Sequence, residues 1–272
     1  MKPTEKNIGF IGAGNMASAI ISGLLNAGYK NSQIYASSPE DDHLKRLSND
    51  FSVNVSKKNE DILNSVSTLV LAVKPNVVEA VLEELSNLIS EQKPLLISIV
   101  AGFKISSVES KLKSKIKIIR AMPNTPASIG LGVSALTNND QIKEEDKQVA
   151  TSIFDSVGVT CWLEESSFDL FTALISSGPA YIFYLIEALQ EVAKGLNLEP
   201  DLTKQLIVEM IKGSATLAGE SSDSPSLLRE KVTSPGGVTE KALEILNKRK
   251  VNRSVVEAIL EATAKSKSLG RS

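Results

Sequence analysis

The sequence predicts an α/β fold: a doubly wound parallel sheet over residues 1–164, followed by an all-α domain over residues 165–272. Three observations predict it. A short apolar strand at residues 7–11 runs directly into a G-x-G-x-x-A turn at residues 12–17. Short apolar runs then alternate with amphipathic stretches, and after residue 166 only amphipathic helical stretches follow. The first part is therefore of the Rossmann type, and 272 residues suffice for two domains.

The elements of the first part alternate along the chain. The expected strands lie at residues 7–11, 33–36, 68–72, 95–100, 115–120, 132–136 and 159–163. The expected helices lie at residues 16–27, 77–88 and 106–112, and another begins at Asp140. Such alternation indicates crossover connections and hence parallel strands.

The second part contains six expected helices, at residues 169–176, 180–196, 202–220, 226–232, 240–248 and 255–268. Ser224-Pro225 provides an N-cap followed by a first-turn proline, and Ser254 with Glu257 has the S-x-x-E form of a capping box. The run Ile-Phe-Tyr-Leu-Ile at residues 182–186 is apolar on every side. Since a helix that is apolar all round must be buried, we expect these helices to pack against a second copy of the chain.

The glycine-rich turn predicts a ligand with a pyrophosphate group. Gly12 permits a tight turn, Gly14 lets the backbone approach a phosphate without a Cβ in the way, and Ala17 lets the next helix pack closely. The helix that follows directs its free N–H groups at the phosphates. A glycine-rich turn without any ligand is the alternative interpretation.

The end of the second strand predicts which dinucleotide is bound. Sites for NAD place an acidic residue there to bind the ribose 2′-hydroxyl, whereas this chain has Ser37 and Ser38. Two hydroxyls suit a 2′-phosphate, so we expect NADP(H), with NAD(H) as a second cofactor. The acidic residues 40–42 are expected to form the first turn of the next helix.

Composition excludes several classes of function. The formal net charge is −2 and the basic residues are scattered, so neither nucleic acid nor an anionic membrane is expected as a partner. Cys161 is the only cysteine, which excludes a disulfide framework and a multi-cysteine metal site; we expect a buried structural thiol and no metal. The N-terminal residues have no apolar core typical of a signal peptide, and the apolar stretch 173–189 is interrupted and contains Glu187. We therefore expect a cytoplasmic protein.

A single histidine limits the chemistry. His43 lies in a charged stretch expected to be an exposed helix, away from every motif. Serine triads, Cys-His pairs and common zinc sites all need a histidine, so the reaction must proceed without a protein imidazole.

Three loops are expected at the carboxyl ends of strands, where a doubly wound sheet binds its ligand. Lys74 follows one strand, Ala101 follows the next, and Asn124 lies in a loop stiffened by two prolines beneath the expected nicotinamide. Ordinary turns at strand ends are the alternative interpretation.

Two further loops lie in the helical part. Gly178-Pro179 interrupts an apolar helix that begins near Thr172, and Thr-Ser-Pro-Gly-Gly-Val-Thr at residues 233–239 joins two helices. The amides of Gly237, Val238 and Thr239, with the hydroxyls of Ser234 and Thr239, form a nest that suits a carboxylate. A plain helix N-cap would give the same sequence.

Six segments together resemble pyrroline-5-carboxylate reductases: G-A-G-N-M, A-S-S-P, A-V-K-P, M-P-N-T-P, S-G-P-A-Y and S-P-G-G-V-T, in this order along nearly the whole chain. The resemblance implies the last step of proline synthesis, hydride transfer from NAD(P)H to the C=N carbon of L-Δ1-pyrroline-5-carboxylate to give L-proline. It also implies a homo-oligomer, either a dimer interlocked through the helical domain or a larger ring such as a pentamer of dimers.

The resemblance also implies a role for individual residues. A first group, Ile11, Gly12, Ala13, Gly14, Asn15 and Met16, would cradle the pyrophosphate. Ser38 and Asn59 would contact the adenosine ribose or its phosphate, and Val73, Lys74 and Ala101 would line the cofactor groove. Substrate would be held by Glu165, Ser234, Gly237, Val238 and Thr239, with Thr172 nearby. The chain departs from the family at Ile175-Ser176, where a Ser-Gly pair is usual, and at Lys231, where some members have an amide.

Two other functions remain as alternatives. An NADP-dependent oxidoreductase acting on another imine or on a hydroxyacid would have a similar architecture, although a hydroxyacid enzyme needs a lysine or histidine to protonate an alkoxide. A non-catalytic NADP-binding module would not need a loop able to hold a carboxylate. An imine reductase fits the lack of a catalytic histidine because the substrate nitrogen brings its own proton.

Overall fold

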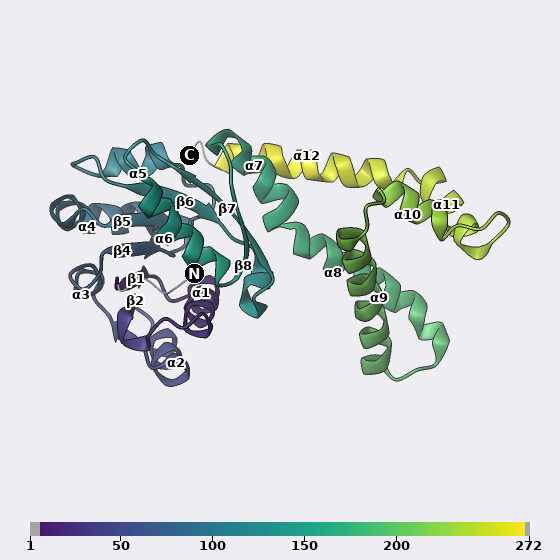
Figure 1. Cartoon of the computed structure of the whole chain (residues 1–272), viewed down its shortest axis with the longest axis horizontal. Coiled ribbons are helices and arrows are strands. Elements are labelled where there is room, and N and C mark those ends of the chain that lie inside the picture. Colours follow the sequence, from purple (N-terminus) through teal and green to yellow (C-terminus); the bar gives the residue numbers. More distant parts are fainter. Residues whose placement is uncertain (1–5, 270–272) are drawn as a thin grey trace. The chain divides into compact units, whose positions relative to one another are not determined.

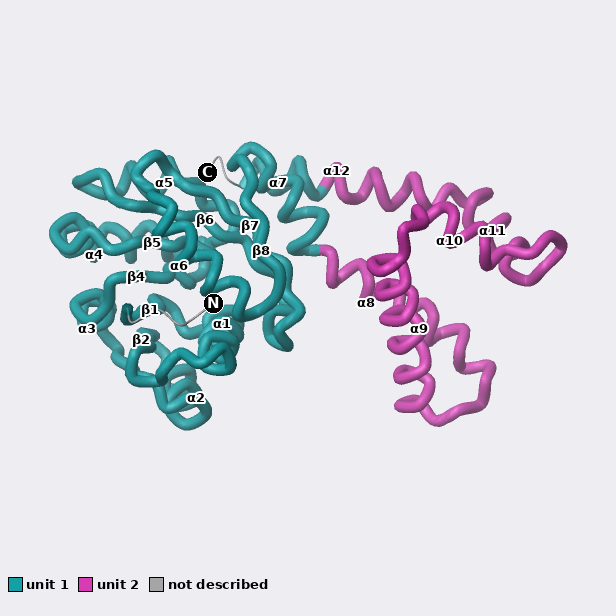
Figure 2. Tube along the Cα trace, in the orientation of Figure 1, with its two compact units in different colours: residues 1–177, 262–272 teal, residues 178–261 magenta. Residues whose placement is uncertain are grey.

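The structure is a computed structural model that describes residues 6–269. The N-terminal residues, in which no signal peptide is expected, lie mostly outside the described part of the chain. Two compact units are present (Figure 2): unit 1 comprises residues 1–177 and 262–272, and unit 2 comprises residues 178–261. Unit 2 is thus inserted into the sequence of unit 1.

Unit 1 is built on one sheet of eight strands in the order β3-β2-β1-β4-β5-β6-β7-β8 (Figure 1). The strands are β1 (Ile8–Ile11), β2 (Ile34–Ser37), β3 (Asn54–Ser56), β4 (Thr68–Leu71), β5 (Leu95–Ser98), β6 (Ile118–Met122), β7 (Gly132–Asn138) and β8 (Gly158–Trp162). All neighbouring pairs from β3 to β6 are parallel. The doubly wound sheet that the sequence predicts is confirmed.

Helices cover both faces of the sheet, because alternate strand residues point to opposite sides. On one face, Phe10 and Val70 pack with α1 (Asn15–Asn26), α2 (Asp41–Phe51) and α6 (Glu144–Asp155). On the other face, Ile11 and Leu71 pack with α3 (Asn59–Leu63), α4 (Val78–Gln92) and α5 (Ile105–Lys111). The two apolar cores fix the sheet, and hence the strand ends, between the helix layers.

One pair of strands departs from the parallel pattern. β6 and β7 are antiparallel, since only the short loop after Met122 joins them, and a parallel pair needs a long crossover connection. Strand β8 then returns parallel to β7 after α6.

Two short elements and one boundary differ from expectation. β3 and α3 were not predicted because Asn54–Ser56 is a brief edge strand of mostly polar residues and Asn59–Leu63 is little more than one turn. The helix expected to begin at Asp140 begins at Glu144 instead. The reason is that the Asp146 carboxylate accepts a hydrogen bond from the Lys143 amide at 3.0 Å, which caps the helix there.

The remaining helices are α7 (Phe168–Phe171), α8 (Gly178–Ala193), α9 (Pro200–Glu220), α10 (Pro225–Lys231), α11 (Val238–Lys248) and α12 (Val251–Leu269). Ser224 caps α10 as predicted, since its hydroxyl accepts a hydrogen bond from the Leu227 amide. The capping box predicted at Ser254 is wrong. α12 begins at Val251, after Lys250 adopts a left-handed conformation (φ 55°), and the Ser254 hydroxyl donates to the Lys250 carbonyl within the first turns.

Unit 2 exposes much apolar surface. Phe183, Tyr184, Val192, Met210 and Leu217 are all at least half exposed. No hydrophobic side chain between residues 178 and 261 belongs to the buried core of the described chain. Such a surface is too large for an isolated helical unit and is typical of an interface.

Candidate active site

The glycine-rich turn connects β1 to α1. Gly12 has φ +99°, and a Cβ at this position would lie 2.6 Å from the carbonyl oxygen of Ala72, so only glycine fits. Gly14 is different, because a Cβ there would meet nothing within 4 Å. The space in front of Gly14 therefore admits a ligand at the start of α1.

The first turn of α1 suits an anion. Gly14 caps the helix without a side-chain hydrogen bond, and the first turn contains no acidic residue. The free amides and the helix dipole thus face no negative protein group. Together with Gly14, this first turn fits the pyrophosphate of a dinucleotide.

The end of β2 presents hydroxyl groups beside this turn. Ser37 and Ser38 are both buried. The Ser37 hydroxyl donates a hydrogen bond of 2.8 Å to Oδ1 of Asn59, which joins the end of β2 to the start of α3. The Ser38 hydroxyl oxygen accepts a hydrogen bond from the Glu40 amide at 3.2 Å. Three residues expected to contact the adenosine ribose therefore lie together.

The expectation that His43 lies away from every motif is wrong. It lies on α2 as predicted, but its Nδ1 is 3.4 Å from the Ser38 hydroxyl, and its Nε2 is 3.3 Å from the Glu40 carboxylate. The contact is local, because His43 is only five residues from Ser38 and the first turn of α2 carries its ring back to the end of β2. The prediction of a fully solvated helix face missed it. Of the acidic residues 40–42, Asp41 and Asp42 lie in the first turn of α2 as expected, whereas Glu40 is the N-cap residue before it. Lys57 pairs with Asp41 at 2.7 Å, and this hydrogen bond lowers the pKa of the Asp41 carboxyl.

A pocket of about 500 Å³ opens at the carboxyl ends of β4 and β5. It brings together Ala101, which follows β5, and Thr172, two residues separately predicted to serve the site. Val73 and Lys74 lie in the loop that precedes the pocket residues Pro75 and Asn76. The other lining residues are Gly102, Ala173, Ser177, Ala262, Lys265, Ser266 and Leu269.

Sequence reasoning missed part of this pocket. Asn76 lies in the A-V-K-P-N loop, next to residues that were predicted. Lys265 and Ser266 belong to the end of α12, and the Ser266 hydroxyl donates a hydrogen bond of 2.7 Å to the Asp169 carboxylate. A contact across 97 residues of sequence left no local signal that could have revealed it.

Thr172 begins an irregular helical segment. Residues 172–176 form a π-helical turn between α7 and α8, a feature that is frequent at functional sites. The turn contains the atypical pair Ile175-Ser176, and the Ser176 hydroxyl is buried without a hydrogen-bond partner among the described residues. The departure from the family pattern therefore coincides with the irregular turn.

Glu165 and Asn124 are both engaged with the protein. The Glu165 carboxylate pairs with Arg120 at 2.9 Å and accepts a hydrogen bond from the Ile105 amide at 3.0 Å. The Asn124 side chain is buried; its Oδ1 accepts from the Val133 amide, and its Nδ2 donates to the Ile175 carbonyl. These side chains hold together the loops that border the carboxyl edge of the sheet.

The loop expected to bind a carboxylate lies in unit 2, between α10 and α11. Gly236 has φ +71°, and its amide donates to the Glu240 carboxylate at 2.7 Å. The Gly237 amide donates to the Ser234 carbonyl at 3.0 Å, so it is not free for a ligand. Val238 and Thr239 begin α11, and their amides have no protein acceptor among residues 6–269. The nest therefore offers two free amides, with the Ser234 and Thr239 hydroxyls beside them.

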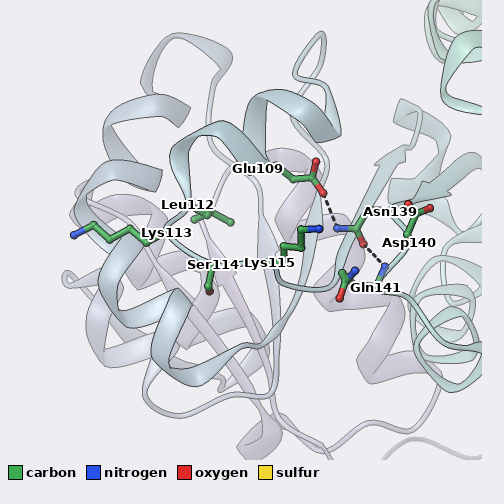
Figure 3. Close-up of a pocket in the computed structure, with 8 residues that line it drawn as sticks. All are labelled: Glu109, Leu112, Lys113, Ser114, Lys115, Asn139, Asp140 and Gln141. Carbon is green, nitrogen blue, oxygen red and sulfur yellow. Dashed lines mark hydrogen bonds between the residues drawn. The ribbon is translucent and has the colours of Figure 1, made fainter.

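Another pocket, of about 480 Å³, lies at the opposite edge of the sheet (Figure 3). Asn139 projects into it, but its amide group donates to Glu109 at 2.9 Å and its oxygen accepts from the Gln141 amide. These polar groups are paired with one another, so this pocket does not contribute to the site. Within residues 6–269, no three His, Cys, Asp or Glu side chains are grouped to hold a metal ion. Cys161 is half-buried rather than buried, and burial raises the pKa of its thiol.

Comparison with known proteins agrees with this geometry. Residues 165–269 match the family described as pyrroline-5-carboxylate reductase dimerisation, and residues 7–102 match NADP oxidoreductase coenzyme F420-dependent. Pyrroline-5-carboxylate reductase of Pasteurella multocida is 38% identical, with 97% of this chain and 98% of that protein covered.

Two solved structures are similar over their whole length. A pyrroline-5-carboxylate reductase from Coxiella burnetii has a TM-score of 0.90 and 36% identity, covering 99% of this chain and 100% of that one. Plasmodium falciparum pyrroline carboxylate reductase with NADP bound has a TM-score of 0.89 and 31% identity, covering 98% of each chain. The resemblance seen in the sequence is confirmed, and the chain belongs to the pyrroline-5-carboxylate reductase family.

Proposed function

We propose that the chain reduces L-Δ1-pyrroline-5-carboxylate to L-proline with NADPH, the last step of proline biosynthesis. The observation that carries this proposal is the pocket that joins Ala101 to Thr172 at the carboxyl edge of the sheet. NADPH supplies the hydride that adds to the C=N carbon of the substrate. The relatives named above, which carry this activity in their names, support the same assignment.

The cofactor is assigned to the carboxyl edge of the sheet. Its pyrophosphate lies at the turn formed by Ile11, Gly12, Ala13, Gly14, Asn15 and Met16, where Gly14 leaves open space. Ser37, Ser38 and Asn59 serve the adenosine ribose and its 2′-phosphate. Val73, Lys74 and Ala101 line the groove toward the nicotinamide, and Asn124 supports the loop beneath it.

The substrate is assigned to the helical residues. Ser234 with the amides of Val238 and Thr239 holds the carboxylate, while Gly237 shapes the loop by donating its own amide to Ser234. Thr239 first, and Thr172 second, orient the ring nitrogen. Glu165 positions the loops at the border of the site, because its carboxylate binds both Arg120 and the Ile105 amide.

No protein acid is needed in this reaction. A protonated imine accepts hydride at carbon, and its nitrogen becomes a neutral amine without taking another proton. The chain's task is therefore to place the substrate and the nicotinamide in the reactive geometry, which can supply a large share of a rate enhancement. A preorganised hydroxyl at the nitrogen adds to it.

One observation favours a second candidate. Lys265 lines the same pocket as Ala101 and Thr172, and an NADP-dependent hydroxyacid dehydrogenase needs such a group to protonate an alkoxide. NADPH oxidation by the purified protein, with pyrroline-5-carboxylate in one arm and 2-oxo acids in the other, separates the two. Turnover only with the imine supports the reductase, turnover only with 2-oxo acids supports the dehydrogenase, and no turnover supports a binding module.

We further propose that the chain works as a soluble, cytoplasmic homodimer that needs neither nucleic acid nor a membrane, and that dimers assemble into a pentamer of dimers. The helical run Glu165–Leu196 is long and apolar enough to cross a membrane by composition, but it falls within the segment that matches the dimerisation family. Light scattering on the purified protein tests the assembly: a ring gives ten times the 29.2 kDa mass of one chain.

A further inference from the structure

His43 lies beside Ser38 at the end of β2, where the adenosine ribose of the cofactor is assigned. Its ring contacts the Ser38 hydroxyl at 3.4 Å through Nδ1 and the Glu40 carboxylate at 3.3 Å through Nε2. The side chain is 34% exposed, so it is accessible to a ligand at the end of β2. It is also the only histidine in the sequence.

The neighbours of the ring determine what it does in each charge state. The Glu40 carboxylate accepts a hydrogen bond only from a protonated Nε2, which leaves Nδ1 of the neutral ring as an acceptor. The Ser38 hydroxyl then donates its hydrogen to Nδ1. The Ser38 oxygen already accepts from the Glu40 amide, so a neutral His43 leaves this hydroxyl no hydrogen for a phosphate.

Protonation of the ring reverses this arrangement. Nδ1 of an imidazolium is a donor, so Ser38 keeps its hydrogen for another acceptor. An anion beside Ser38 then receives the hydrogen of this hydroxyl on an ionised oxygen, with the positive charge of the ring next to it. Charge-assisted hydrogen bonds of this kind are the stronger ones.

We propose that His43 is a specificity-determining residue for the 2′-phosphate of NADP(H), and that it makes the preference for the phosphorylated cofactor increase as the pH falls from 8.5 to 5.5. The proposal rests on the assignment of the adenosine ribose to Ser37 and Ser38. Histidine is the side chain whose charge changes in this range of pH.

Two other charged groups from the elements near the ring, Lys57 and Arg46, are bound to other partners. Lys57, from the loop after β3, pairs with Asp41 at 2.7 Å. Arg46, one turn farther along α2, donates to the Ser18 hydroxyl of α1 at 2.9 Å. The remaining charged residues near the start of α2 and α3 are Asp42, Lys45, Lys58, Glu60 and Asp61.

Binding of adenosine 2′,5′-bisphosphate and of 5′-AMP to the full-length protein, measured by calorimetry from pH 5.5 to 8.5 at constant ionic strength, tests the proposal. His43→Gln keeps a polar side chain without the charge, and Lys45→Gln is the matched control because it removes one charge from the same helix. The 2′-phosphate itself titrates near pH 6. Because that ionisation is common to all variants, the comparison between variants isolates His43.

We expect the wild type to bind the bisphosphate about tenfold more tightly than His43→Gln at pH 5.5, as for one charge-assisted hydrogen bond, and equally at pH 8.5. Affinity for 5′-AMP stays the same in both proteins. Lys45→Gln follows the wild type over the whole range. His43→Arg, a permanent cation, retains the preference at pH 8.5.

Equal affinities of wild type and His43→Gln at every pH would overturn the inference while leaving the cofactor site intact. If the wild type binds the bisphosphate no better than 5′-AMP at any pH, the assignment of Ser37 and Ser38 fails together with the inference. In steady-state assays at pH 5.5, the inference requires a higher KM for NADPH in His43→Gln with an unchanged kcat and an unchanged KM for NADH; at pH 8.5 the KM values for NADPH should be equal.

Discussion

Arg120 and Glu165 form an ion pair of 2.9 Å that connects the sheet of unit 1 to the turn before α7. The Arg120 side chain is only 5% exposed, and its guanidinium lies 4.7 Å from the centre of the Phe168 ring. Glu165 in turn accepts the Ile105 amide. One carboxylate thus joins β6, the start of α5 and the approach to α7.

We expect Arg120→Met to lower the free energy of unfolding by about 2 kcal/mol, because it leaves a partly buried carboxylate without its charged partner. Arg253→Met is the matched control. It breaks an exposed pair with Glu257, and we expect a loss of under about 1 kcal/mol. Urea unfolding at one fixed protein concentration compares them; equal losses would contradict a structural role for the buried pair.

Alanine substitutions at the two glycines of the turn should have opposite results. Gly12→Ala places a Cβ 2.6 Å from a backbone carbonyl, so we expect little folded protein. Gly14→Ala meets no neighbour in the protein and should fold normally, yet its methyl group occupies the space assigned to the pyrophosphate. Circular dichroism and NADPH titration distinguish the two; normal NADPH affinity in a folded Gly14→Ala would place the pyrophosphate elsewhere.

Ser38→Asp should reverse the cofactor preference, because a carboxylate repels the 2′-phosphate and suits a ribose hydroxyl. We expect the ratio of kcat/KM for NADPH to that for NADH to fall by about two orders of magnitude, as for like charges in contact. Ser32→Asp, before the opposite end of the same strand, should leave the ratio unchanged. An unchanged ratio in Ser38→Asp would mean that this loop does not contact the 2′-phosphate.

Thr239→Ala should lower the rate of hydride transfer about a hundredfold, since it removes a preorganised donor at the substrate nitrogen. Thr172→Ala should lower it less, and His43→Ala should hardly change it when NADPH is saturating. Single-turnover measurements give these rates directly, and their pH profile should follow ionisation of the substrate imine. Loss of turnover in a folded His43→Ala would contradict a mechanism without protein imidazole.

Unit 2 should be stable only as part of an oligomer. Phe183, which is 57% exposed, and Tyr184, which is 77% exposed, are expected to lie in the interface. Phe183→Asp should therefore weaken association, whereas Glu191→Gln, an exposed change on the same helix, should not. Sedimentation velocity measures both, and a stable, active wild-type monomer in dilute solution would disprove the obligate dimer.

The local spacing of apolar residues predicted most of the fold. The strands and long helices were recognisable because their apolar residues recur at the spacing of a strand or a helix and pack into the core. β3 and α3 were missed because they are short and largely polar. The pairing of β3 with β2 depends on tertiary contacts that the local sequence does not show. Ser254 was taken for a cap although the turn at Lys250 had already started the helix.

The site was predictable only where its residues follow strand ends. Gly12, Ser38 and Ala101 occupy positions that the architecture itself assigns to ligands. Lys265 and Ser266 reach the site through helix packing, which spacing along the chain does not record. His43 is only five residues from Ser38, and its contact was missed because its charged neighbours suggested a solvated helix. Gly237 was predicted by sequence to offer a free amide, but a tight turn uses that amide internally.

Unit 1 contains both early and late parts of the polypeptide, because the final turns of α12 pack beside residues near Asp169. During synthesis, the sheet can form as soon as its strands emerge, but the wall of the pocket supplied by Lys265 and Ser266 is translated only after the whole of unit 2. A chain truncated before residue 262 would thus have a complete nucleotide turn but an incomplete pocket. We expect such a chain to bind NADPH without oxidising it.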